Sequence, residues 1–129
     1  MNRRTFLAAS AVGMASMNAF GAPSNRVRVG LMGAGGRGKE LSKVYSGIPG
    51  VEISVIADVD ENRAKDVAGL VEKAAGKAPR TETDFRKILD DKNVDVFVCA
   101  APNHWHAPAT ILATKAGKHV YVEKPCSHN

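Results

Sequence analysis

Residues 26–38, RVRVGLMGAGGRG, decide the fold of this chain. The first seven, Arg26 to Met32, form a short β-rich run. The next six, Gly33 to Gly38, fit the pattern G-x-G-x-x-G, and a helical stretch follows to about Ser46. Alone, this pattern is a weak signal. Here it directly follows a predicted strand and opens a predicted helix, the context that a dinucleotide-binding turn requires.

The glycines of this run have distinct physical roles in such a turn. Gly33 permits a tight turn, Gly35 lets the backbone approach a pyrophosphate, and Gly38 lets the helix pack closely on the strand. The N-terminus of the helix presents free N–H groups and a partial positive charge to phosphates. Arg37 either adds a contact or is an ordinary surface arginine. We predict that the cofactor-binding run comprises Gly33, Ala34, Gly35, Gly36, Arg37 and Gly38.

An acidic residue follows the glycine run at the expected distance. Asp58 ends a second apolar strand, VEISVIAD at 51–58, and lies 20 residues after Gly38. In dinucleotide-binding units, an acid about 20 residues on accepts hydrogen bonds from the adenosine ribose. A carboxylate there repels a 2′-phosphate, so Asp58 favours NAD; Arg63 weakens that preference, and NADP remains possible. The alternative is that Asp58 is a turn residue at the end of its strand.

The rest of the chain alternates between helix and strand. A helix capped by Asp60 ends at Gly76, a short strand at most precedes a brief helix around Ile88, and further elements follow at 94–101 (strand), 104–116 (helix) and 119–123 (strand). Apolar strands separated by helices indicate a parallel sheet covered on both faces. Right-handed crossovers then give an α/β, doubly wound, Rossmann-like fold. In such a sheet the glycine run, Asn103, His106 and Lys124 face one crevice at the carboxyl ends of the strands.

The second half of the chain carries a family resemblance. Residues 101–129, APNHWHAPATILATKAGKHVYVEKPCSHN, resemble the Gfo/Idh/MocA oxidoreductases, whose pattern is T-P-N-x-x-H, a helix, then A-G-K-H-V-x-x-E-K-P. Ala101 stands in place of the usual threonine. The resemblance covers roughly residues 26–129, and the E-K-P element is its most specific part. The combination of a leader at residues 1–21, G-G-R-G at 35–38 and N-H-W-H at 103–106 resembles the exported branch of this family.

The resemblance implies roles for particular residues. Pro102, Asn103 and His106 match positions that line the cofactor near its ribose and nicotinamide end, and Glu123 matches a cofactor-side contact. Lys124 matches the lysine that hydrogen-bonds the reacting hydroxyl and helps to move its proton. The implied cofactor is NAD, with NADP possible. The implied substrate is a sugar or cyclitol, and the implied assembly of the full-length protein is a homo-oligomer.

Two alternative functions remain at this stage. One is an NAD-dependent glycosidase of the same superfamily, which oxidises a sugar transiently to allow elimination. The resemblance implies that this group tends to replace the lysine of E-K-P, so Lys124 favours net oxidation. The other is a non-catalytic module that senses a nucleotide or sugar.

The first 21 residues, MNRRTFLAASAVGMASMNAFG, are predicted to be a secretory signal. Arg3 and Arg4 precede a short run of small, weakly apolar residues, and no acidic residue occurs before Glu40. The run is too short and too rich in alanine and glycine for a membrane span, so no stable membrane anchor is expected. Paired arginines resemble the twin-arginine type. We therefore expect cleavage after Gly21, export by the twin-arginine machinery and a periplasmic location; the alternative is an uncleaved amphipathic arm.

Composition and residue spacing limit the kinds of ligand that the chain is expected to bind. The formal charge of +5 includes Arg3 and Arg4. The positive charge of the remaining residues is too small and too scattered to favour binding of nucleic acid. The spacing of the histidines and cysteines predicts no metal site. Cys99 lies in an apolar run and is expected to be a buried free thiol, although a bond to Cys126 is the alternative. The pattern stops four residues after Pro125, so we expect residues 26–129 to be an incomplete domain of a truncated protein that lacks the family's C-terminal substrate domain.

Overall fold

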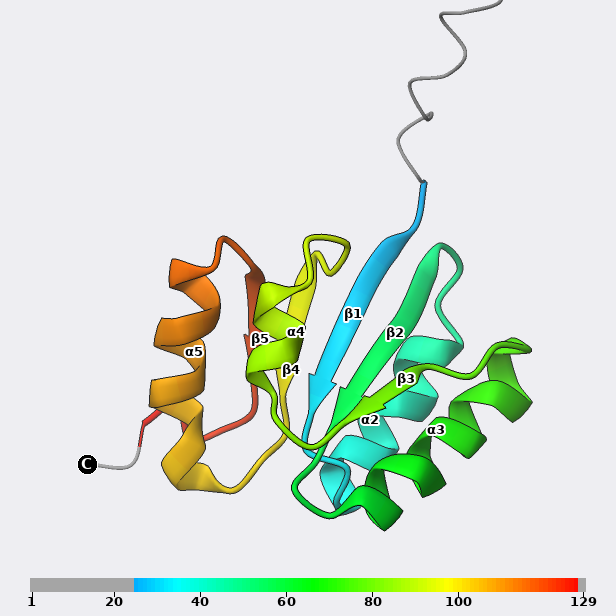
Figure 1. The fold of residues 1–129 in the computed structure, drawn as a ribbon, viewed down its shortest axis with the longest axis horizontal. Helices are drawn as coiled ribbons and strands as arrows, with labels where there is room; N and C mark the ends of the chain where they lie inside the picture. Colours follow the sequence, from blue (N-terminus) through cyan, green and yellow to red (C-terminus); the bar gives the residue numbers. More distant parts are fainter. Residues whose placement is uncertain (1–24, 128–129) are drawn as a thin grey trace, which may run out of the picture.

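The protein folds as a parallel sheet with helices on both faces (Figure 1). The structure, a computed structural model, describes residues 25–127. The predicted signal at residues 1–21 lies outside the described residues. In chain order the elements are β1 (Val27–Met32), α2 (Gly36–Ser46), β2 (Val51–Ala57), α3 (Glu61–Ala75), β3 (Arg80–Glu82), α4 (Arg86–Asp90), β4 (Val96–Cys99), η2 (Asn103–Trp105), α5 (His106–Lys115) and β5 (His119–Val122).

The strand order confirms the predicted doubly wound topology. The five strands lie in the order β3-β2-β1-β4-β5, and every neighbouring pair is parallel. The chain moves outward from β1 in one direction as far as β3 and then returns to the other side of β1 with β4. The direction therefore reverses between β1 and β4, and ligands of such sheets bind outside the carboxyl ends of the strands at this point.

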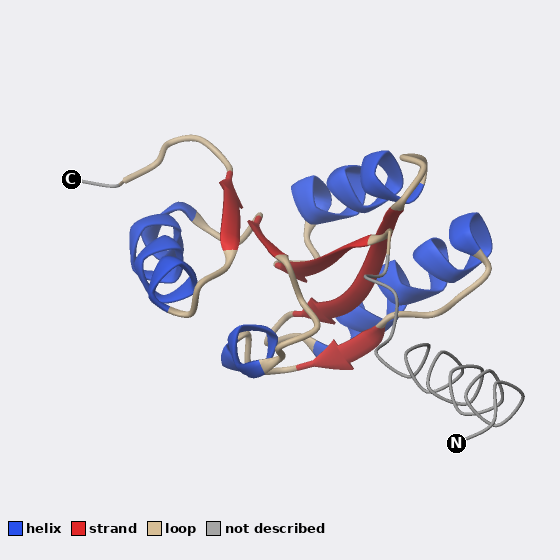
Figure 2. Ribbon diagram, turned by 90° about the horizontal axis from the view of Figure 1, so that it is seen from above, coloured by secondary structure: helices blue, strands red, loops and turns tan. Residues whose placement is uncertain are grey.

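Two apolar layers hold the helices on the sheet. Val29 and Leu31 of β1 point into one layer, which includes Leu41 of α2 and Val67 and Val71 of α3. Met32 points into the other, with α4 and α5. Figure 2 shows the two pairs of helices on opposite sides of the strands. Because successive side chains of a strand point to opposite faces, a run of apolar residues supplies both layers at once.

Two elements differ from the sequence prediction by more than one residue. The predicted helix at 104–116 is divided into the 3₁₀ turn η2 and the α-helix α5, because the Trp105 N–H donates to the Pro102 carbonyl at 2.9 Å, a three-residue spacing. The predicted strand at 94–101 is shorter, since the N–H of Val94 donates to Asp91 in a turn rather than to a neighbouring strand.

Candidate functional site

The glycine run forms a turn between β1 and α2. The packing of this turn requires glycine at only some of its positions. Gly33 has φ +98°, and a Cβ there would lie 2.7 Å from the backbone of Ala100. A Cβ on Gly38 would overlap the Gly33 carbonyl. A Cβ on Gly35 or Gly36 would meet nothing within 4 Å in the described chain beyond its own neighbours and helix backbone. The fold therefore accounts for Gly33 and Gly38, whereas the space over Gly35 and Gly36 is open for a ligand.

The N-terminus of α2 suits an anion in that space. Its N-cap is Gly35, which offers no side chain to the first N–H groups, and the first turn contains no acidic residue. The Lys39 N–H closes the first helical bond to Gly35, so the N–H groups before it point out of the helix. These groups and the helix dipole favour a diphosphate. The residues present thus fit the diphosphate of a dinucleotide.

Asp58, at the end of β2, is hydrogen-bonded to the glycine run. One carboxylate oxygen accepts the Ala34 N–H at 2.7 Å, and the other accepts the Asp60 N–H at 2.8 Å. The Gly33 N–H also donates to the Ala57 carbonyl at 2.8 Å. A carboxylate has about four acceptor sites, so sites remain for ribose hydroxyls. The structure places Asp58 beside the turn, and its contact with a ribose stays a prediction.

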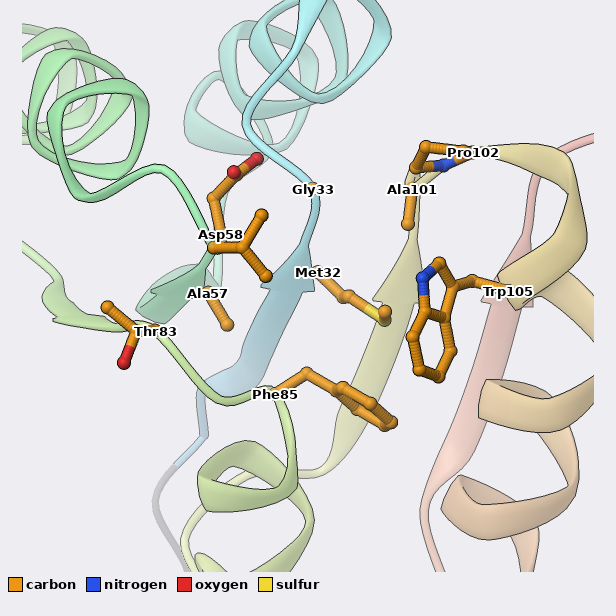
Figure 3. A pocket seen from close by; sticks show the side chains of 10 residues that line it. Met32, Gly33, Ala57, Asp58, Thr83, Phe85, Ala101, Pro102 and Trp105 are labelled. Atoms are coloured by element: carbon orange, nitrogen blue, oxygen red, sulfur yellow. The ribbon is translucent and has the colours of Figure 1, made fainter.

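A pocket next to Asp58 has an apolar floor (Figure 3). Its cavity volume is about 90 Å³, and it opens to solvent. In Figure 3 the side chains of Met32, Phe85 and Trp105 point toward one another, and the two rings lie 5.6 Å apart in an edge-to-face arrangement. Such a surface suits a flat heterocycle such as adenine. The lining residues are Met32, Gly33, Ala57, Asp58, Val59, Thr83, Phe85, Ala101, Pro102 and Trp105.

Sequence reasoning missed the apolar part of this pocket. The sequence places Phe85 next to the brief helix predicted around Ile88, and Met32 at the end of a predicted strand, with no sign that either lines a site. Trp105 is the one tryptophan of the chain and follows Asn103 in the loop after β4. A lone large aromatic residue at the carboxyl end of a strand was the available signal for it.

A second pocket lies on the other side of the loop after β4. Its lining combines residues from α2, from the loop after β4 and from the end of β5: Arg37, Ala100, Ala101, Asn103, His106, Glu123 and Lys124. Ala101 lines both pockets. The structure therefore brings together the predicted residues of the crevice, with the glycine run at one side. An elongated ligand that passes over the glycine run can reach into both pockets.

An ion pair joins α2 to the end of β5 in this second pocket. Arg37 Nε lies 2.9 Å from Glu123 Oε1, and the Tyr121 hydroxyl donates to the same oxygen at 3.0 Å. Arg37 also pairs with Glu40 at 3.0 Å. The hydrogen bond from Arg37 holds the pKa of Glu123 below its ordinary value, and Glu40 and Glu123 together raise the pKa of Arg37. Arg37 thus forms ion pairs with two carboxylates, and the sequence did not predict these pairs.

The pKa of Glu123 gives a pH prediction. Since it is lowered in the folded chain, the Arg37–Glu123 pair is fully formed above the ordinary glutamate pKa of about 4.3 and is lost as the pH falls through the lower, folded value. We expect the NMR signal of the Arg37 Nε–H group to stay constant above that range and to move below it. Glu40→Gln should leave this transition in place, and Glu123→Gln should remove it. A transition that survives Glu123→Gln would contradict the assignment.

Lys124 and His106 contrast in their surroundings. Lys124 is exposed at the edge of the second pocket, and its peptide bond to Pro125 is cis. His106 is only 1% exposed, and its ring nitrogens contact two carbonyl oxygens: Nδ1 lies 2.6 Å from Pro125 O and Nε2 lies 2.8 Å from Ala101 O. Contact of either residue with a cofactor stays a prediction. The structure shows in addition that His106 is tied into the protein itself.

The remaining sequence predictions concern metals, thiols and membranes. Within residues 25–127, no group of three or more His, Cys, Asp or Glu side chains is arranged to hold a metal ion. Cys99 is buried and Cys126 is exposed, and both thiols are free; burial raises the pKa of Cys99. None of the described helices has the length and apolar character that a membrane crossing needs.

The fold and these pockets define a dinucleotide-binding Rossmann domain. Residues 27–129 match the Gfo/Idh/MocA family, described as an oxidoreductase family with an NAD-binding Rossmann fold. The chain belongs to this family, as the resemblance of its second half indicated.

Known proteins of this kind are similar over most of the chain. A glycosyl hydrolase family 109 protein of Saccharopolyspora erythraea is 36% identical over 103 residues, which is 77% of this chain and 22% of that protein. The crystal structure of GenD2 from gentamicin A biosynthesis in complex with NAD has a TM-score of 0.73 at 29% identity and covers 83% of this chain and 29% of GenD2. Levoglucosan dehydrogenase with NADH has a TM-score of 0.67 at 33% identity and covers 79% of this chain and 28% of the enzyme. The chain thus spans less than a third of the length of these proteins.

Proposed function

We propose that the complete protein carrying this chain is an NAD-dependent oxidoreductase. It transfers hydride between the nicotinamide and a carbon of a sugar or cyclitol that bears a hydroxyl group. The observation that carries this proposal is the position of Lys124, an exposed amine at the edge of the pocket that the glycine run, Asn103 and His106 adjoin. The similarity to levoglucosan dehydrogenase supports a substrate of this class.

Different residues of the chain bind the cofactor and transfer the proton. The N–H groups of α2 would hold the diphosphate, Asp58 would accept from the adenosine ribose, and the apolar pocket with Phe85 and Trp105 would hold the adenine. NAD, when bound, would supply the hydride acceptor. An unprotonated Lys124 amine accepts the proton of the substrate hydroxyl as the carbonyl forms, and in the reverse direction its ammonium returns that proton.

Asp58 favours NAD as the preferred cofactor. Its carboxylate lies against the first turn of the site and would repel a 2′-phosphate on the ribose. Arg63 is turned toward Asp60, with Nε and Oδ2 3.3 Å apart, which leaves it less available to such a phosphate. NADP therefore binds more weakly in this proposal.

The second candidate is an NAD-dependent glycosidase, which the similarity to a glycosyl hydrolase family 109 protein favours. Lys124 favours net oxidation instead. The two functions are separated by incubating the complete protein and NAD with sugars, cyclitols and their glycosides. We expect NADH to accumulate in proportion to oxidised sugar. Release of a sugar from a glycoside with no net NADH would identify the glycosidase.

We further propose that residues 1–21 direct export by the twin-arginine route and that the protein works in the periplasm. Arg3, Arg4 and the absence of acidic residues before Glu40 support this. Export in the folded state would let the protein carry its cofactor with it. A mature protein whose N-terminal sequence starts at Met1 would contradict cleavage after Gly21. Homo-oligomerisation of the complete protein remains a prediction from the resemblance.

A further inference from the structure

The buried ring of His106 joins two loops of the site. His106 is the first residue of α5, and its Nε2 contacts the carbonyl of Ala101 in the loop after β4. Its Nδ1 contacts the carbonyl of Pro125 in the loop after β5. Distances of 2.8 and 2.6 Å make both contacts close enough for hydrogen bonds.

The two carbonyl oxygens determine how many protons the ring must carry to hydrogen-bond both of them. A carbonyl oxygen only accepts hydrogen bonds, and a neutral imidazole carries one N–H and one bare nitrogen. Both contacts are therefore hydrogen bonds only when the ring carries two protons. In a neutral ring, one nitrogen would place its lone pair against a carbonyl oxygen, and that loop would no longer be held.

Lys124 lies between two residues that are held by contacts within the site. Pro125, which directly follows Lys124, is held through its carbonyl by His106. Glu123, which directly precedes Lys124, is held through its side chain by Arg37 and Tyr121. Lys124 itself is exposed. The position of its backbone is thus set by contacts of the residues on either side of it.

We propose that His106 is a positioning residue for Lys124. In its doubly protonated form it fixes the Lys124–Pro125 segment against the loop after β4, and loss of one proton releases one of the two loops. The inference rests on the proposed function only where it concerns catalysis, because the link between the loops is a property of this chain.

Charged side chains of both signs lie around the ring. Arg37 from α2, and Glu123 and Lys124 from the end of β5, line the same pocket as His106. His106 also begins α5, whose first turn contains no acidic residue. The titratable side chains of the adjoining elements β4, η2 and β5 are Cys99, His104, His119 and Tyr121.

Nuclear magnetic resonance of the chain tests the link without any enzyme assay. With ¹⁵N-labelled histidine and backbone, we expect the His106 ring nitrogens and the amides of Ala101, Glu123 and Cys126 to change with pH at one common midpoint. His106→Asn should remove that change from the amides. The control is His119→Asn, which replaces an exposed histidine at the start of β5 and should leave the change intact.

The wild-type titration needs no variant and decides the inference even if His106→Asn fails to fold. Amides that do not follow the ring, or a ring that keeps a single proton throughout while both loops stay fixed, would overturn it. His106→Gln provides a second variant with a longer side chain, and the same loss of the common midpoint is expected.

Kinetics of the complete protein test the consequence for Lys124. We expect His106→Asn to lower kcat by about 10- to 100-fold, since a displacement of 1 Å can cost about 100-fold, with a smaller change in KM for NAD and a flatter pH profile. A wild-type kcat and pH profile in this variant, in a protein that Lys124→Ala inactivates, would overturn the positioning role. If no oxidoreductase activity exists at all, the proposed function fails, and the titration alone still decides whether His106 links the loops.

Discussion

Replacing Gly38 with alanine is expected to abolish NAD binding by this chain. The added Cβ would overlap the carbonyl oxygen of Gly33, which is a backbone atom and cannot rotate away. Relief requires α2 to move away from the turn that it closes, and the N–H groups that we propose to bind the diphosphate move with it. Overpacking of this kind costs about 1–3 kcal/mol of stability.

Two other glycines provide matched controls for Gly38→Ala. Gly69→Ala lies within α3, where a Cβ meets nothing within 4 Å of the described chain, and should leave binding intact. Gly35→Ala should keep the melting temperature of the free chain but weaken binding, because its methyl group enters the open space over the turn. Titration with NADH and thermal unfolding with and without NAD measure both quantities. Wild-type affinity in Gly38→Ala would show that the diphosphate lies elsewhere.

Lys124→Ala should lower kcat of the complete protein by about 10²- to 10⁴-fold, the usual contribution of a proton-transfer group. The KM for NAD should change little, because in the proposed site the glycine run and Asp58 hold the other end of the cofactor. Lys124→Arg should also be poorly active, since a guanidinium keeps the charge but does not give up its proton.

Lys115→Ala is the control for Lys124, because Lys115 is an exposed lysine in the last turn of α5. Steady-state rates of NADH formation over a range of substrate and NAD concentrations separate kcat from KM. Full activity of Lys124→Ala would exclude this lysine as the proton-transfer group. A wild-type complete protein that binds NADH but forms none would favour a module that binds nucleotide or sugar without catalysis.

The parts of the site that lie close in sequence could be predicted without a structure. The turn at Gly33 to Gly38 and the acid at Asp58 follow a fixed spacing, because one strand–helix–strand unit sets the distance between them. Both lie at the carboxyl edge of the sheet, as expected. The alternation of strands and helices also predicted the order of the layers.

The contacts between distant elements could not be predicted in the same way. Arg37 meets Glu123, and Phe85 meets Trp105, only after the order and register of the strands have brought their elements together. Gly30 is a further example: a Cβ on this strand residue would overlap the Ile88 side chain of α4, yet nothing in its local sequence marks it. Its small size is required by the fold and not by the ligand.

The unequal accessibility of the two cysteines makes the site open to selective labelling. Cys99 is buried at the end of β4, whereas Cys126 is exposed two residues after Lys124. A maleimide dye should therefore attach to Cys126 alone in the folded chain. Its fluorescence would report directly on the segment that carries the lysine, with no need to introduce a new thiol.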